Sequence, residues 1–302
     1  MTPTVVCRLD EVGRDGWLKA RTDGLGGSDA AAVCGIDPWA SPFSVYQSKV
    51  HPVPDEDNAA MMWGRKLEGV IAEHFAELHP ELAVTDAREM YAHPERPWQM
   101  ATPDRVLEGD DGYGILEVKT TNWRRASEWA GGSIPDGAAL QTHHYLTVMG
   151  FAWAWVVVLI DGRDYHEVRV DADPSLAAKL TEVESRFWHD HVLAEVPPPV
   201  DDHRATSEAL AALYDRPVPE SVELGLEAVL AVDELNDLKA QQKALKSRRD
   251  LLENTVKVAL GNATEGTVDG DVAVTWTEVP ESVVESYTRK PYRRLTVKGT
   301  KK

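Results

Sequence analysis

The sequence has few cysteines, no long apolar run and a shortage of positive charge. Its two cysteines, Cys7 and Cys34, are too few for a disulfide framework, a structural zinc site or an iron–sulfur cluster held by four cysteines. The apolar stretch from Phe151 to Ile160 has ten residues, whereas a membrane-spanning helix needs roughly 18. The N-terminus also lacks the apolar core of a signal peptide. These absences predict a cytoplasmic protein with no membrane partner.

The shortage of positive charge is uneven along the chain. The formal net charge is −18, which argues against a protein that coats nucleic acid without specificity. Residues 287–302, however, contain seven basic residues and no acidic one. Such an acidic protein with a local basic strip is compatible with DNA held in a groove or channel, and equally with no nucleic acid at all.

The length of 302 residues and the apolar content of 43% allow one large domain, or one medium domain with an appendage. Three consecutive prolines, Pro197–Pro199, mark a change in composition. We therefore expect a catalytic domain over residues 1–198 and a C-terminal extension over 199–302. Within that extension the sequence predicts a helical arm (221–261), a β-hairpin (266–278) and a basic tail (287–302).

One stretch, from Ala101 to Lys119, predicts a β-hairpin. Residues 102–107 and 114–120 read as strands joined by a turn rich in glycine and aspartate. Because strand side chains alternate between faces, Glu117 and Lys119 point the same way. Asp104 lies on the partner strand, roughly opposite.

This hairpin brings two carboxylates and one ammonium together. The carboxylates of Asp104 and Glu117 repel each other, and a divalent cation held between them is the usual resolution. Lys119 can then orient the attacking water and stabilise the charge that develops on a phosphate. The simpler alternative is a surface hairpin in which Glu117 and Lys119 form a solvated pair.

Two helices with apolar residues at helical spacing flank the hairpin in the sequence. The first, Ala59–Leu78, carries Glu68, which its position next to a core leucine assigns to the solvent. The second, Gly137–Met149, carries Gln141 and Tyr145 on one face. We expect two further strands before the hairpin, at residues 85–90 and 93–100.

A glycine-rich turn near the N-terminus predicts an anion site. Gly26 and Gly27 precede Ser28 and a short helix, and Arg21 lies seven residues before Ser28. Free backbone N–H groups at a helix start, beside a hydroxyl and a guanidinium, suit a phosphate. The alternative is an ordinary turn followed by a helix cap.

The remaining sequence predicts a buried strand at residues 151–160, a second strand at 165–170 and an amphipathic helix at 174–195. In the arm, Leu238, Leu245 and Leu252 are spaced by seven residues, but Gln242 and Arg249 interrupt the alternate seam positions. Such a seam is weak as a coiled coil, and favours an antiparallel arm or an interaction surface.

Taken together, these motifs resemble the YqaJ-like phage recombinase family, which is related to lambda exonuclease within the PD-(D/E)xK nuclease superfamily. The resemblance covers roughly residues 11–195 and implies an α/β (α+β) fold with a restriction-endonuclease-like core, in which helices flank a mixed central β-sheet. The matching motifs are Gly26-Gly27-Ser28-Asp29, Pro38-Trp39, Ser41-Pro42, Gly64 with Leu67-Glu68, Pro103-Asp104, Glu117-Val118-Lys119, and Gln141 with His144-Tyr145-Leu146.

The resemblance implies a Mg²⁺-dependent 5′-to-3′ exonuclease, with Mn²⁺ as a substitute metal. Such an enzyme acts on double-stranded DNA ends and leaves a 3′ single strand for an annealing protein. Family relatives form trimeric or tetrameric rings around DNA, and a ring needs positive potential only in its channel. A phage-encoded enzyme of this kind works in the cytoplasm of the bacterial host.

The resemblance also assigns roles to single residues. Asp104, Glu117 and the carbonyl of Val118 would bind the metal, and Glu68 would complete or order its ligand shell. Lys119 would position the attacking water. The other assignments are Gln141 and Tyr145 near the water or the scissile backbone, Arg21 and Ser28 on the 5′-phosphate, and His144 without a role.

Two alternatives remain open at this point. A RecB-type or restriction-like DNA endonuclease would share the same superfamily and the same metal site. A non-catalytic protein that binds recombination partners would use the helical arm instead. The intact set of Asp104, Glu117 and Lys119 argues against the second alternative, because a degenerate site is expected to lose a charge.

Overall fold

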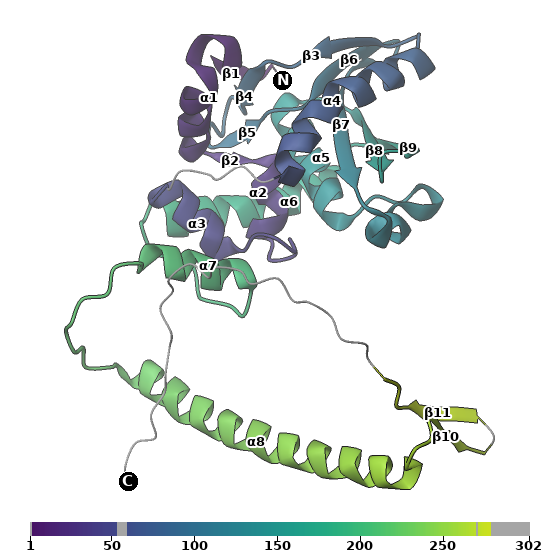
Figure 1. Cartoon of the computed structure of the whole chain (residues 1–302). Coiled ribbons are helices and arrows are strands. Elements are labelled where there is room, and N and C mark those ends of the chain that lie inside the picture. The colour runs from purple at the N-terminus through teal and green to yellow at the C-terminus, as the bar shows by residue number, and fades with distance from the viewer. Residues whose placement is uncertain (1, 53–58, 270, 279–302) are drawn as a thin grey trace. The chain divides into compact units, whose positions relative to one another are not determined.

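The computed structural model describes residues 2–52, 59–269 and 271–278 (Figure 1). The chain divides into two compact units, Met1–Leu213 and Tyr214–Lys302. A mixed sheet forms the centre of the first unit, and in the described residues its strand order is β3-β6-β7-β8-β9. Strands β7 and β8 are parallel, whereas the other neighbours are antiparallel. The strands are β3 (Ala83–Asp86), β6 (Arg105–Gly109), β7 (Gly112–Thr121), β8 (Trp153–Ile160) and β9 (Asp164–Asp171).

Strands β6 and β7 form the predicted hairpin. Gly109 lies opposite Gly112, so Asp110 and Asp111 make a two-residue loop. Gly112 has a φ of 83°, in the left-handed region that glycine enters without a steric penalty. The first strand begins at Arg105, three residues later than predicted, because residues 102–104 bend into the hairpin.

One helix covers each face of this sheet. Helix α4 (Ala59–Leu78) has the bounds that the periodicity predicted, and its Phe75 packs in one core cluster with Leu116. Helix α5 (Asp136–Met149) packs on the opposite face, where Tyr145 joins a cluster with Ile115. Since Ile115 and Leu116 are neighbours on β7, the strand alternation expected from the sequence decides which helix each one meets.

A second sheet has the order β1-β4-β5-β2 in the described part of the chain. The prediction of continuous strands at residues 85–90 and 93–100 is wrong. In place of the second, His93 Nδ1 accepts hydrogen bonds from the backbone N–H groups of Glu95 and Arg96, at 3.1 and 3.2 Å, and closes a turn. The strands are β1 (Thr4–Arg8), β2 (Leu25–Gly26), β4 (Glu89–Ala92) and β5 (Gln99–Ala101).

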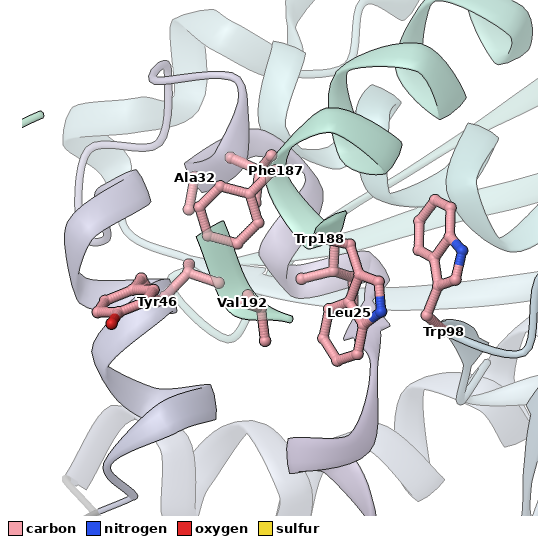
Figure 2. Close-up of a cluster of buried hydrophobic side chains, with 9 residues drawn as sticks. Leu25, Ala32, Tyr46, Trp98, Phe187, Trp188 and Val192 are labelled. Carbon is pink, nitrogen blue, oxygen red and sulfur yellow. The ribbon is translucent and has the colours of Figure 1, made fainter. Parts of the chain in front are cut away.

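A helical layer buries the cluster drawn in Figure 2, where side chains from distant parts of the sequence meet. The expected helix at residues 174–195 is shorter than predicted: α6 (Pro174–Phe187) continues only as a π-helical turn, η3 (Trp188–Val192). The other helices that contribute are α2 (Gly27–Val33) and α3 (Pro42–Val50). The labelled side chains are Leu25, Ala32, Tyr46, Trp98, Phe187, Trp188 and Val192.

Helix α7 (Arg204–Leu213) packs against α3 and so extends the first unit beyond residue 198, where the sequence placed a boundary. The buried hydroxyls of Ser41 and Thr206 lie 2.7 Å apart and join the two helices. The prolines at 197–199 therefore connect two parts of one unit. The remaining helical segments of this unit are α1 (Leu9–Ala20), η1 (Arg21–Asp23) and η2 (Trp123–Gly132).

The second unit contains a long helix and a small hairpin. Helix α8 (Leu226–Leu260) has 35 residues, none of them buried. Strands β10 (Glu265–Val268) and β11 (Asp271–Thr275) pair in antiparallel fashion. These elements occupy the segments in which the sequence predicted an arm and a hairpin. The predicted basic tail at residues 287–302 lies outside the described residues.

Candidate active site

The hairpin brings Asp104, Glu117 and Lys119 together where β6 begins beside β7, the middle strand of the central sheet. Asp104 lies directly before β6, and its Oδ2 accepts a hydrogen bond of 2.7 Å from the backbone N–H of Val118 on β7. This bond holds the Asp104 side chain across the hairpin from Glu117. Lys119 Nζ donates to Glu117 Oε1 at 2.7 Å.

Glu117 is the most deeply buried of these groups, with 3% of its surface exposed. Its Oε1 atom also accepts a hydrogen bond of 2.6 Å from Gln141 Nε2. Its Oε2 atom is buried and has no hydrogen-bond partner. A buried carboxylate oxygen without a partner costs free energy, and such an atom calls for a cation or a donor.

The electrostatics of the centre are those of crowded like charges. Burial raises the pKa of Asp104 well above its ordinary value, and the nearby charges of Glu117 and Glu68 raise it further. Burial likewise raises the pKa of Glu117, although Lys119 opposes the shift. The pKa of Lys119 is raised because Glu117 and Asp104 outweigh the opposing effect of burial, so the ammonium form is retained. The single ammonium group of Lys119 therefore does not compensate the negative charge of both carboxylates.

Glu68 lies near this centre on α4 and is held by Arg105. Arg105 Nη1 donates to Glu68 Oε1 at 2.6 Å, and Arg105 Nε lies 2.9 Å from Asp86 Oδ1. Glu68 is therefore half-buried in an ion pair, in contrast to the solvent-facing position that its place in the sequence favoured. Arg105 carried no signal in the sequence beyond its position after Asp104.

Helix α5 contributes Gln141 and Tyr145, which share one face as predicted. Lys119 Nζ donates to Gln141 Oε1 at 2.7 Å, so the amide of Gln141 bridges Lys119 and Glu117. The hydroxyl of Tyr145 lies 3.3 Å from Thr102 Oγ1. Burial, followed by the negative charge of Glu117, raises the pKa of Tyr145, which keeps its hydroxyl protonated.

The two residues predicted to bind a phosphate form a pair: Arg21 Nη2 donates to Ser28 Oγ at 2.7 Å. Asp29, of the same motif, and Lys49, which the sequence did not single out, support the pair. Lys49 Nζ donates to Asp29 Oδ2 at 2.8 Å and to the carbonyl of Arg21 at 3.0 Å. Asp29 Oδ2 also accepts the backbone N–H of Gly26 at 2.9 Å. The loop that carries the pair is therefore tied to the start of α2.

Gly27 places the Arg21–Ser28 pair close to the helix that carries Gln141 and Tyr145. A Cβ atom at this position would lie 2.5 Å from Tyr145 Cε1 and 2.9 Å from Gln141 Cγ. No side chain fits there, so glycine allows the start of α2 to approach α5 closely. Ser28 is thereby held next to the helix that carries Gln141.

A cavity of about 710 Å³ runs along this junction. Ser28, Lys119 and Gln141 line it, together with Arg125 of η2 and the exposed Trp39. A second cavity, of about 310 Å³, lies on the side of Asp104, Glu68 and Arg105. Lys119 and Gln141 therefore line the larger cavity with Ser28, whereas Asp104 and Glu68 line the smaller one.

His144 has a structural position that no local sequence pattern indicates. It is fully buried, with Nδ1 2.7 Å from Glu184 Oε1 and Nε2 2.8 Å from the carbonyl of Met100. Burial lowers the pKa of His144, but Glu184 and the other contacts outweigh this effect and raise it overall. The pair links α5, α6 and β5 behind the reactive centre.

The donor set fits a divalent metal ion. Asp104 and Glu117 supply the carboxylate oxygens that Mg²⁺ prefers, and the Oε2 atom of Glu117 has no other partner. Among the described residues, no group of three His, Cys, Asp or Glu side chains is arranged around one point. The reason is that Glu68 turns to Arg105, whereas Glu117 Oε1 is bound by Lys119 and Gln141.

The first unit is thus an α/β fold in which two carboxylates and a lysine meet on a hairpin of the central sheet. Residues 16–152 match the family model of the YqaJ-like viral recombinase domain, which confirms the resemblance drawn from the motifs. The uncharacterized protein YqaJ of Bacillus subtilis (strain 168) is 29% identical over 287 residues, which cover 93% of this chain and 89% of the relative. That similarity therefore includes much of the second unit.

Solved structures support the fold. The structure of LHK-Exo in complex with dAMP has a TM-score of 0.51 and 22% sequence identity to this chain, and the match covers 60% of this chain and 94% of the other. A second structure, of the alkaline exonuclease LHK-Exo from Laribacter hongkongensis, has a TM-score of 0.50 with the same identity and coverage. The expected restriction-endonuclease-like core is thereby confirmed. Of the helices in the described ranges, none has the length and hydropathy that spanning a bilayer requires.

Proposed function

We propose that this protein is a Mg²⁺-dependent exonuclease that removes nucleotides from the 5′ strand at double-stranded DNA ends, and that Mn²⁺ can replace Mg²⁺. The observation that carries the proposal is the meeting of Asp104, Glu117 and Lys119, with Glu117 Oε2 unpartnered, next to the Arg21–Ser28 pair. The family match and the fold shared with an alkaline exonuclease support it.

In this proposal, Asp104 and Glu117 hold the metal, aided by the carbonyl of Val118. When bound, the metal supplies Lewis-acid chemistry, which favours the attacking water and the leaving 3′ oxygen. Lys119 stays protonated and stabilises negative charge on the scissile phosphate. Gln141 fixes the positions of Lys119 and Glu117 relative to each other, because its amide group is hydrogen-bonded to both. Glu68 orders this shell through Arg105.

The direction of digestion follows from the phosphate site. Arg21 and Ser28 supply a guanidinium and a hydroxyl at the start of α2, a combination that suits a terminal 5′-phosphate. Ser28 and Lys119 line the same cavity. A bound 5′-phosphate would then present the first phosphodiester bond to the reactive centre, so that digestion runs from 5′ to 3′.

The biological role we propose is phage-type DNA recombination in the cytoplasm of a bacterial host. The product is a 3′ single strand that an annealing protein takes up. A homo-oligomeric ring, trimeric or tetrameric, would confine positive potential to its channel and accommodate the net charge of −18. These elements of the proposal rest on the family match.

The decisive experiment is digestion of a linear duplex that carries a label at one end, with Mg²⁺ and with EDTA. Substrates with 5′-phosphate and 5′-hydroxyl ends are compared with covalently closed circles. We expect loss of nucleotides from the 5′ strand alone, faster with the phosphate and absent on circles. Lys119→Ala should abolish cleavage and retain binding to DNA ends, whereas Lys179→Ala, on α6, serves as a matched control.

The other outcomes separate the alternatives. Cut circles would show an endonuclease of the RecB or restriction type. Absence of cleavage with every divalent metal would show a protein that binds recombination partners without catalysis. Equal rates on phosphate and hydroxyl ends would remove Arg21 and Ser28 from the proposal and leave the metal site in place.

A further inference from the structure

Helix α8 of the second unit, the long helix of Figure 1, has no buried residue. It carries an apolar stripe whose side chains are all exposed. Leu245, at its middle, is 68% exposed. A helix of 35 residues is about 52 Å long, and most helices in proteins draw their stability from packing of such a face. The stripe is therefore an interaction surface. It consists of Leu235, Leu238, Leu245, Leu252 and Val256.

The charges of α8 are divided between its two halves. Residues 226–240 contain four acidic residues and one basic residue, for a net charge of −3. Residues 241–260 contain five basic and two acidic residues, for a net charge of +3. The two halves are thus equal and opposite, and one copy of the helix is complementary to a second copy turned end for end.

We propose that α8 pairs with α8 of a second copy of this chain, in antiparallel orientation. This orientation sets each acidic half against a basic half, whereas a parallel pair would set like charges side by side. Pairing also covers the apolar stripe of both helices. The occupant of this surface is therefore the protein itself.

The spacing of the stripe allows several registers, of which one, centred near the middle of α8, overlaps the two helices over nearly their whole length. With the two-fold axis between residues 243 and 244, Leu235 meets Leu252 of the second copy. In the next layers Leu238 meets Arg249, and Gln242 meets Leu245. The polar seam positions acquire a role in this register, because Arg249 lies beside the acidic half of the second copy.

Disulfide trapping in the full chain tests the orientation directly. Leu238→Cys and Arg249→Cys are introduced into separate chains in which Cys7 and Cys34 are replaced by serine. One chain carries an added mass tag, and the mixture is oxidised. We expect the mixed disulfide between the two variants to predominate over disulfides within either variant. Predominance of same-variant disulfides would show parallel pairing, and absence of any disulfide would show another occupant; either result overturns the proposal.

Charge reversal tests whether complementarity drives the pairing. Asp233, Glu234 and Asp237 changed to lysine make both halves positive. Lys243, Lys246 and Arg248 changed to glutamate make both halves negative. Each triple variant should lose the mixed disulfide, and a chain with all six changes should regain it. Retention in the triple variants, or failure of the six-fold variant to regain the disulfide, would overturn the proposal.

Discussion

Two ionic clusters of the first unit contain the same residue types but shift the pKa of their carboxylates in opposite directions. At the reactive centre, Asp104 and Glu117 share one nearby ammonium, Lys119, and the pKa of both acids is raised. Next to the Arg21–Ser28 pair, Asp29 faces Lys49. Burial raises the pKa of Asp29, but Lys49, Arg21 and two hydrogen bonds outweigh that effect and lower it overall.

This difference separates a cluster with an uncompensated carboxylate from one in which the carboxylate is fully paired. The Asp29 cluster is complete, because its carboxylate receives an ammonium at 2.8 Å and a backbone N–H at 2.9 Å. The reactive centre is incomplete, because an oxygen of Glu117 is buried without a partner. Neutralising a carboxylate should therefore stabilise the fold at the centre and destabilise it at Asp29.

The largest expected effect is that of Asp104→Asn on cleavage. Asparagine keeps the acceptor for the Val118 N–H but removes a charge that, in the proposed function, binds the metal. Cleavage should fall by at least about 100-fold, as for loss of one preorganised electrostatic group. In EDTA at neutral pH, thermal denaturation should show a higher melting temperature than the wild type, because a repelled charge is removed. A lower melting temperature would show that the Asp104 charge is already compensated without metal.

Asp29→Asn should have the reverse effect on stability. It leaves Lys49, whose side chain is 5% exposed, without its carboxylate. The free energy of unfolding should fall by about 2 kcal/mol, somewhat less than for a fully buried pair. Chemical denaturation measures it, with Glu208→Gln as the matched control. That change breaks the exposed pair with Arg204 and should cost at most about 0.5 kcal/mol. Equal losses of unfolding free energy in Asp29→Asn and Glu208→Gln would show that the Asp29–Lys49 pair contributes no more than an exposed pair.

Gly27→Ala probes the contact that connects the two clusters. Its Cβ would overlap Tyr145 and Gln141, so α2 and α5 must separate. Overpacking of this kind should lower the free energy of unfolding by about 1.5 kcal/mol and slow cleavage by displacing Gln141. Gly137→Ala is the matched control in the same helix pair, since its nearest neighbour, Ala31 Cβ, is 3.8 Å away. An unchanged cleavage rate in Gly27→Ala would show that cleavage does not depend on the contact between α2 and α5.

The local elements that carry the Asp104–Glu117 cluster could be predicted from the sequence. The hairpin around Asp104 and Glu117 was predicted because turn residues and strand alternation are local signals, and β6 and β7 confirm it. Helix α4 was predicted to the residue, since its apolar spacing is regular over five turns. The common face of Glu117 and Lys119 followed from strand alternation, whereas the half-buried position of Glu68 did not follow from its place on α4.

The contacts between residues far apart in the chain could not be predicted from the sequence. Lys49 meets Asp29 across twenty residues, and Glu184 meets His144 across forty. Pairs of this kind depend on how helices pack, which no local pattern encodes. The turn at His93 was missed for another reason, because its imidazole replaces strand pairing by accepting two backbone N–H groups.

The smallest expected effect is a pH dependence that the buried His144–Glu184 pair adds to the comparison. The pKa of His144 is raised in the folded state. Its stabilising contribution is therefore complete below the unfolded pKa, about 6.5, and is lost as pH rises through the folded value. A tenfold difference in proton affinity between the folded and unfolded states corresponds to about 1.4 kcal/mol.

His144→Gln isolates this contribution, because glutamine keeps an amide donor near Glu184 but does not titrate. The difference in free energy of unfolding between wild type and His144→Gln should be largest near pH 6 and decrease toward pH 9. Urea denaturation at each pH measures it, and taking the difference removes the titration of Asp104 and Glu117. A difference that grows with pH would mean that His144 is neutral in the folded protein. The pair would then join α5 to α6 as a neutral hydrogen bond, unlike the charged pair at Asp29.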